Sequence, residues 1–122
     1  PFEREQYDAA LSFETLHHFP YQEKGAIYQK LFEAIRPGGF YLECDYVACC
    51  EEEEALCLEL YAAKRQKSDL PAHLPIHVDL PLTMEHQIEL MRRAGFQEVQ
   101  LRYQKESTAI FQARKATPLS KE

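Results

Sequence analysis

The chain alternates short apolar runs with segments in which apolar residues recur at helical spacing. Residues 7–13 form a nearly uncharged run of strand length, which is typical of a strand buried on both faces of a parallel sheet. Residues 21–35 have the apolar periodicity of an amphipathic helix packed on that sheet. The Arg-Pro-Gly-Gly sequence at 36–39 predicts the end of this helix, because a residue before proline avoids the helical region and glycine can turn the chain. A second strand, parallel to the first, is expected over 40–47.

The rest of the chain predicts two more helices and a pair of strands. The helices are expected over 51–67 and 84–94, the second with Thr83 as its N-cap. Residues 96–103 and 108–113 have strand character and are joined by only four residues, a length that can connect only antiparallel neighbours. The fold class is therefore α/β, with a mostly parallel sheet of four strands, one antiparallel strand, and helices on its faces.

Residues 68–83 stand apart because they contain three prolines. Proline at this density excludes a regular helix or a central strand and predicts a long loop. Loops of this length often cover binding sites, so a substrate-covering lid and a passive connector are both open alternatives.

Composition narrows the class of protein. The chain has 122 residues, of which 45% are hydrophobic and 28% charged, which suits one globular domain. The net charge is −6 and the basic residues are scattered except at 64–67, so no broad surface for nucleic acid is expected. No apolar run approaches the ~20 residues of a membrane-spanning helix, and the polar residues 1–6 do not resemble a signal peptide. We expect a cytoplasmic protein with no membrane or nucleic-acid partner.

The cysteines lack the paired spacing of a zinc site. Two of them, Cys49 and Cys50, are adjacent, which would strain a simple disulfide framework. Free, reduced thiols and no bound metal are expected. The alternative is a metal or thiol site built from Cys49, Cys50, Cys57, His73 and His77.

Four segments, in this order, resemble the second half of a class I S-adenosylmethionine-dependent methyltransferase. Residues 7–19 resemble the fourth strand of that family and the turn after it. Residues 31–40 resemble its helix end, L-x-P-G-G turn and fifth strand. Residues 91–99 resemble the junction of a helix, an A-G-F sequence and the sixth strand, and the closing hairpin completes the series. The resemblance implies a partial Rossmann-like methyltransferase fold whose final strand is reversed and inserted between the fifth and sixth.

The chain departs from this family in one large respect. Members of the family hold the cofactor with a glycine-rich loop after the first strand and an acidic residue after the second. None of the four glycines of this chain lies in such a loop, and its first strand resembles the fourth strand of the family. Residues 1–122 are therefore expected to be the C-terminal part of a single methyltransferase domain, with strands one to three missing. We expect this chain alone to be inactive and to bind S-adenosylmethionine weakly or not at all.

The resemblance implies site residues where the predicted parallel strands end. Ser12, Phe13 and Glu14 would lie beside the cofactor. A substrate-binding role is implied for His17, His18, Asp45 and Tyr46, and an imidazole at His17 could deprotonate the acceptor near neutral pH. The alternative is that these residues only end strands or cap a helix.

The implied activity is transfer of a methyl group from S-adenosylmethionine to a small-molecule acceptor by the full-length protein. The alternative is a non-catalytic α/β interaction or regulatory module derived from a methyltransferase. Because a central strand whose neighbours are missing would expose unpaired backbone groups, self-association through residues 7–13, as a dimer, is expected.

Overall fold

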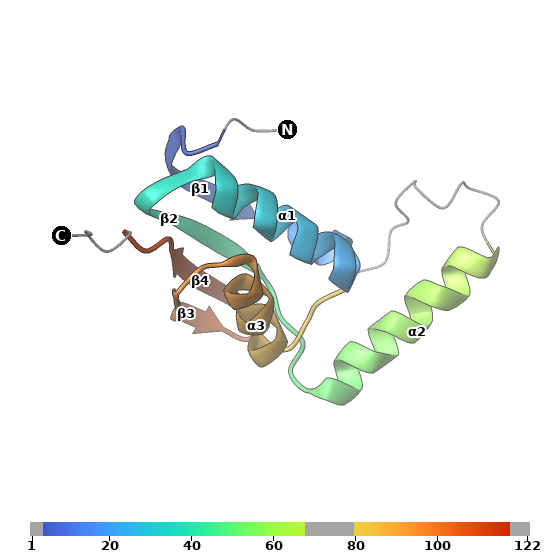
Figure 1. Ribbon diagram of the computed structural model, residues 1–122. Coiled ribbons are helices and arrows are strands. Elements are labelled where there is room, and N and C mark those ends of the chain that lie inside the picture. Colours follow the sequence, from blue (N-terminus) through green and yellow to red (C-terminus); the bar gives the residue numbers. More distant parts are fainter. Residues whose placement is uncertain (1–3, 68–79, 118–122) are drawn as a thin grey trace.

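The computed structural model describes residues 4–67 and 80–117 (Figure 1). Every helix and strand expected from the sequence is present, in the expected order. The elements are β1 (Tyr7–Phe13), the short 3-10 helix η1 (Leu16–His18), α1 (Tyr21–Ala34), β2 (Ile35–Tyr46), α2 (Glu51–Lys67), α3 (Met84–Ala94), β3 (Glu98–Lys105) and β4 (Thr108–Arg114).

The strands form one mixed sheet in the order β1-β2-β4-β3. Only β1 and β2 pair in parallel, whereas β4 pairs antiparallel with both β2 and β3. The expectation of a mostly parallel sheet is therefore wrong. The sheet differs from this expectation because the reversed strand β4 lies between β2 and β3. It therefore forms two antiparallel pairings where β2 and β3 would otherwise form one parallel pairing. The expected hairpin and the insertion of its second strand are confirmed.

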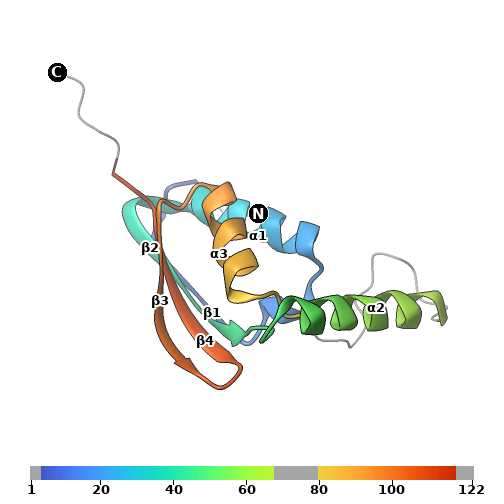
Figure 2. The same ribbon diagram turned by 90° about the horizontal axis from the view of Figure 1, so that it is seen from below.

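Strand β1 lies at the edge of the described sheet. The prediction that it is buried on both faces is wrong, because one of its faces is exposed. Helices α1 and α3 lie on the same face of the sheet (Figure 2). On the opposite face of β1, Leu11 is 75% exposed and Phe13 is 69% exposed. Within the described residues, β2 is the only strand paired with β1.

The Pro-Gly-Gly sequence is part of β2 and not a separate turn. Helix α1 ends at Ala34, and β2 begins at the next residue, with an irregularity in its register opposite Tyr7 and Ala9. Gly38 has a φ of 87°, and a Cβ atom on Gly39 would lie 2.5 Å from the backbone oxygen of Asp8. The two glycines therefore allow the strand to bulge while it stays close to β1.

The two later helices differ in how they pack. Helix α3 has the predicted cap, since the Oγ1 atom of Thr83 accepts a hydrogen bond from the backbone nitrogen of His86 at 3.3 Å. Helix α2 forms as predicted, but none of its residues is buried, and Leu56, Leu58 and Leu60 are each more than half exposed. It extends away from the body of the molecule (Figure 1).

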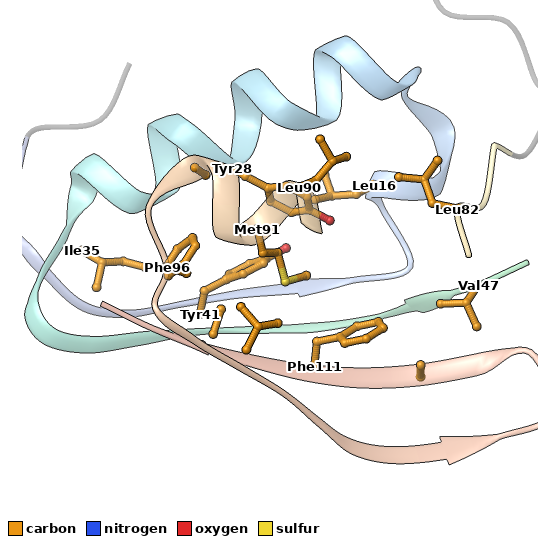
Figure 3. Packing of buried hydrophobic residues seen from close by; sticks show 14 residues of the cluster. Leu16, Tyr28, Ile35, Tyr41, Val47, Leu82, Leu90, Met91, Phe96 and Phe111 are labelled. Atoms are coloured by element: carbon orange, nitrogen blue, oxygen red, sulfur yellow. The ribbon is translucent and has the colours of Figure 1, made fainter. Parts of the chain in front are cut away.

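The apolar core fills the space between the sheet and the pair α1 and α3 (Figure 3). Tyr41 and Phe111 rise from the sheet to meet Tyr28, Met91 and Phe96, all of which are fully or almost fully buried. No helix in the described part of the chain is long and apolar enough to cross a membrane.

Candidate functional site

A buried histidine–aspartate pair lies where β1 and β2 end. His17 belongs to η1, directly after β1, and Asp45 is the penultimate residue of β2. The Nδ1 atom of His17 lies 2.6 Å from Oδ1 of Asp45, and the backbone nitrogen of His17 donates to Oδ2 at 3.1 Å. The side chains are only 5% and 2% exposed. Because the carboxylate contacts both the ring and the backbone of His17, it fixes the orientation of the imidazole.

Two other predicted residues complete this cluster. The ring of Tyr46 packs edge-on against the His17 ring, with centroids 4.8 Å apart. The Tyr46 hydroxyl donates to Oε1 of Glu14 at 3.1 Å. Glu14 has a φ of 50°, and its backbone nitrogen donates to the oxygen of Cys44 at 2.7 Å. The structure thus brings Glu14, His17, Asp45 and Tyr46 together at the carboxyl ends of the parallel strands.

Of the other predicted site residues, Ser12 and Phe13 lie apart from this cluster. Ser12 pairs in register with Glu43, on the core side of the sheet. Phe13 points to the other face, where it lines an apolar hollow of about 360 Å³ together with Leu11, Leu42, Cys44 and Ile110. The side chain of His18 is outside the described part of the molecule.

A second buried polar cluster, centred on Glu43, escaped the sequence analysis. The Oε1 atom of Glu43 accepts hydrogen bonds from the hydroxyls of Tyr28 at 2.7 Å and Tyr41 at 2.9 Å. The amide nitrogen of Gln87 donates to both Glu43 and Tyr28. The sequence did contain a signal: Tyr41, Glu43 and Asp45 alternate along one strand, which places both carboxyl groups on the face of an aromatic core residue.

Burial controls the ionisation of this cluster. It raises the pKa of the Glu43 carboxyl, an effect that the hydroxyls of Tyr28 and Tyr41 oppose. It also lowers the pKa of the Lys24 ammonium group, although Glu43 and Asp45 act in the opposite direction. The core of the molecule therefore contains a lysine, two carboxyl groups and two tyrosine hydroxyls within one layer.

Lys24 connects this layer to the histidine–aspartate pair through the segment 80–83. Its Nζ atom donates to the backbone oxygen of Leu80 at 2.8 Å, and the Leu80 nitrogen donates to the oxygen of His17 at 2.6 Å. Further along, the nitrogen of Ala48 donates to the oxygen of Leu82 at 2.8 Å. The end of the predicted lid loop is thus buried against the site, whereas residues 68–79 of that loop lie outside the described residues.

Helix α2 is connected to the start of α3 by a carboxylate–imidazole pair. The Nδ1 atom of His86 lies 2.8 Å from Oε1 of Glu54, whose Oε2 atom accepts a hydrogen bond from the backbone nitrogen of Thr83 at 2.6 Å. The hydrogen bond to Glu54 raises the pKa of His86. The contact with Glu54 therefore favours the protonated form of the imidazole in the folded protein.

This pair predicts a pH dependence of stability. A pKa that is higher in the folded than in the unfolded state stabilises the fold below the unfolded value of 6.5, and this contribution is lost as the pH rises through the raised value. We expect the free energy of unfolding, measured by urea denaturation, to fall with pH in that window. Glu54→Gln should flatten this slope and the exposed-site control Glu59→Gln should not; an equal slope in all three proteins would contradict the assignment.

No group of three or more His, Cys, Asp or Glu side chains in residues 4–67 and 80–117 is placed to hold a metal ion. Of the alternative metal or thiol site, His73 and His77 lie outside the described residues.

Known proteins resemble this chain in their three-dimensional structure and not in their sequence. No family model and no curated protein matches the sequence. Among solved structures, human N-acetylserotonin methyltransferase in complex with S-adenosylmethionine is similar to 90% of this chain, with a TM-score of 0.64 and 20% identity, over 30% of its own length. A methyltransferase from Methanosarcina mazei is similar to 96% of this chain, with a TM-score of 0.65 and 13% identity, over 63% of its own length. A protein from Bordetella parapertussis, described as a possible exported protein, is similar to 95% of this chain, with a TM-score of 0.68 and 15% identity, over 41% of its own length.

These similarities confirm the resemblance at the level of the fold. The chain has part of the fold of S-adenosylmethionine-dependent methyltransferases, and it spans between about a third and two thirds of the length of these structures.

Proposed function

We propose that this chain supplies the C-terminal half of a domain that transfers a methyl group from S-adenosylmethionine to a small-molecule acceptor. The observation that carries the proposal is the buried His17–Asp45 pair at the carboxyl ends of β1 and β2. Ligands of open α/β sheets bind beyond this end of the parallel strands. The fold similarity supports the same reaction class.

The residues present fit one wall of a site for this cofactor. The half-buried carboxylate of Glu14 suits a ligand that carries a sulfonium charge and hydroxyl groups, and the backbone of Ser12 and Phe13 leads to it along β1. The glycine-rich wall has no counterpart in the sequence. When bound, S-adenosylmethionine supplies an electrophilic methyl group, so the protein has to align the acceptor and remove its proton.

His17 is the residue that we assign to proton removal. The contact of Nδ1 with Asp45 fixes the ring, and the adjacent carboxylate would stabilise the imidazolium that forms when the acceptor loses its proton. Tyr46, whose ring packs against His17, would border the acceptor. Lys24 and Leu80 act as positioning residues, because they hold the backbone of His17 in place.

The proposal is tested in two stages. Calorimetry with S-adenosylmethionine should show no binding, or only weak binding, to this chain alone, and micromolar affinity would contradict the half-site assignment. If the gene encodes a glycine-rich strand–loop–helix in frame before Pro1, the whole product should bind the cofactor. In that protein, His17→Gln should lower kcat by ~10²–10⁴-fold with unchanged cofactor affinity, as loss of a general base does. An unchanged kcat in His17→Gln would exclude this role, and His86→Gln serves as the matched control.

A second candidate function is a non-catalytic interaction module. The observation that favours it is the apolar face of β1, where Leu11 and Phe13 are exposed. A start codon at the beginning of this sequence, without an upstream glycine-rich segment, would favour the module over the enzyme.

A further inference from the structure

Two adjacent thiols stand at the surface where β2 passes into α2. Cys49 and Cys50 are both free and exposed. Their Sγ atoms lie 3.6 Å apart, well beyond the ~2.05 Å of a disulfide bond. The backbone oxygen of Cys50 accepts the first hydrogen bond of α2, from the nitrogen of Glu54 at 3.2 Å. The start of the helix therefore fixes the point from which both thiols project.

A neighbouring carboxylate favours the protonated form of the Cys49 thiol. The Cys49 thiol donates to Oε2 of Glu53 at 3.1 Å, and its backbone nitrogen lies 3.3 Å from Oε1. Hydrogen bonding to Glu53, followed by that to Cys50, raises the pKa of Cys49 to about 12. Hydrogen bonding to its own backbone, and after that to the Cys50 side chain, lowers the pKa of Glu52.

The raised pKa of Cys49 limits the chemistry that this thiol can perform. Thiol oxidation, alkylation and metal binding all proceed through the thiolate, which a raised pKa makes scarce at neutral pH. Among the described residues there is also no third side chain to complete a metal site. A suitable ligand therefore binds through the two sulfur atoms alone and needs no other protein group.

We infer that Cys49 and Cys50 form a vicinal dithiol site for monosubstituted trivalent arsenicals, independently of the proposed methyl transfer. In the reaction, R–As=O and two S–H groups give two As–S bonds, and the oxygen leaves as water with both thiol protons. Arsenic stays trivalent, so no oxidant or reductant is required. The sulfur spacing suits one bridging atom: two ~2.3 Å bonds at a tetrahedral angle, as around zinc, hold their sulfurs ~3.8 Å apart.

The test uses the 122-residue chain with phenylarsine oxide as the probe, followed by intact-mass measurement. We expect one adduct, with the mass of the reagent less one water, that an excess of a monothiol does not remove and that a small dithiol does. Cys49→Ser and Cys50→Ser should each weaken capture on the order of 10²-fold, because the second bond is then no longer intramolecular. Cys44→Ser and Cys57→Ser are the matched controls and should retain the adduct.

An adduct that survives in Cys49→Ser or Cys50→Ser, that is lost in either control, or that a monothiol removes would overturn the inference, as would the absence of any adduct. Circular dichroism of each variant checks that the fold is intact, and serine at these exposed positions should leave it so. Glu53→Gln gives a second readout. It should retain arsenical capture while increasing the rate at which iodoacetamide alkylates Cys49, because the carboxylate no longer holds the thiol proton.

Discussion

Replacing Glu43 with alanine is expected to lower the free energy of unfolding by about 3–6 kcal/mol, since each buried polar group left without its partner costs ~1–3 kcal/mol. Glu43 is fully buried and accepts hydrogen bonds from Tyr28, Tyr41 and Gln87. Alanine would leave the two tyrosine hydroxyls without this acceptor, would leave Gln87 with Tyr28 alone, and would open a cavity in the layer between sheet and helices. Urea denaturation followed by circular dichroism measures the loss.

The matched variant is Glu43→Gln, which keeps the volume and one acceptor oxygen. Its stability should be much closer to that of the native protein, and it should change with pH in a defined way. Since burial raises the pKa of Glu43 above 4.5, the native protein loses stability as the pH rises from 4.5 through the raised value. Glutamine should abolish this slope. Equal stabilities of the alanine and glutamine variants would show that the hydrogen bonds to Glu43 contribute little.

The double substitution of Leu11 and Phe13 by lysine is expected to convert a self-associating protein into a monomer. We propose that a second copy of the chain covers β1, because this edge strand carries exposed apolar side chains and none of the lysines or prolines that protect natural sheet edges. Burial of each of these side chains contributes ~1.5–3 kcal/mol, so the dissociation constant should rise on the order of 10²-fold or more.

Sedimentation velocity over a range of concentrations measures this effect. The double substitution of Leu58 and Leu60 by lysine is the matched control, because it places the same two charges at exposed leucines on α2, the helix that extends away from the sheet. It should associate as the native protein does. A native chain that stays monomeric at high concentration would refute the proposal.

Most of the fold could be predicted from local sequence signals. The capped helix at 84–94, the hairpin at the end of the chain and the strand–helix–strand unit at its start all have short-range causes: an N-cap, a short connection and apolar periodicity. The pairing of strands is different, because the place of β4 between β2 and β3 depends on contacts between distant segments. For the same reason the sequence predicted the helix at 51–67 but could not show that none of its residues is buried by the described part of the chain.

The candidate site was predicted only in part, and the reason is again distance along the chain. The ends of β1 and β2 could be located from the sequence, and Glu14, His17, Asp45 and Tyr46 do meet there. The roles of Lys24 and Gln87 could not be anticipated. Each lies on an amphipathic helix, where a polar residue is normally exposed, and its burial depends on partners from other elements.

The position of β4 has a consequence for the order of folding. The hairpin β3–β4 closes only a short loop, and the crossover from β1 to β2 through α1 closes a loop of moderate length. Pairing Tyr46 with Thr108, by contrast, requires the whole segment between them to be ordered or looped out. The entropy lost on closing that long loop is recovered only when β4 docks. We therefore expect two locally stable halves to form early, and their union along β2 to limit the rate at which the native sheet appears.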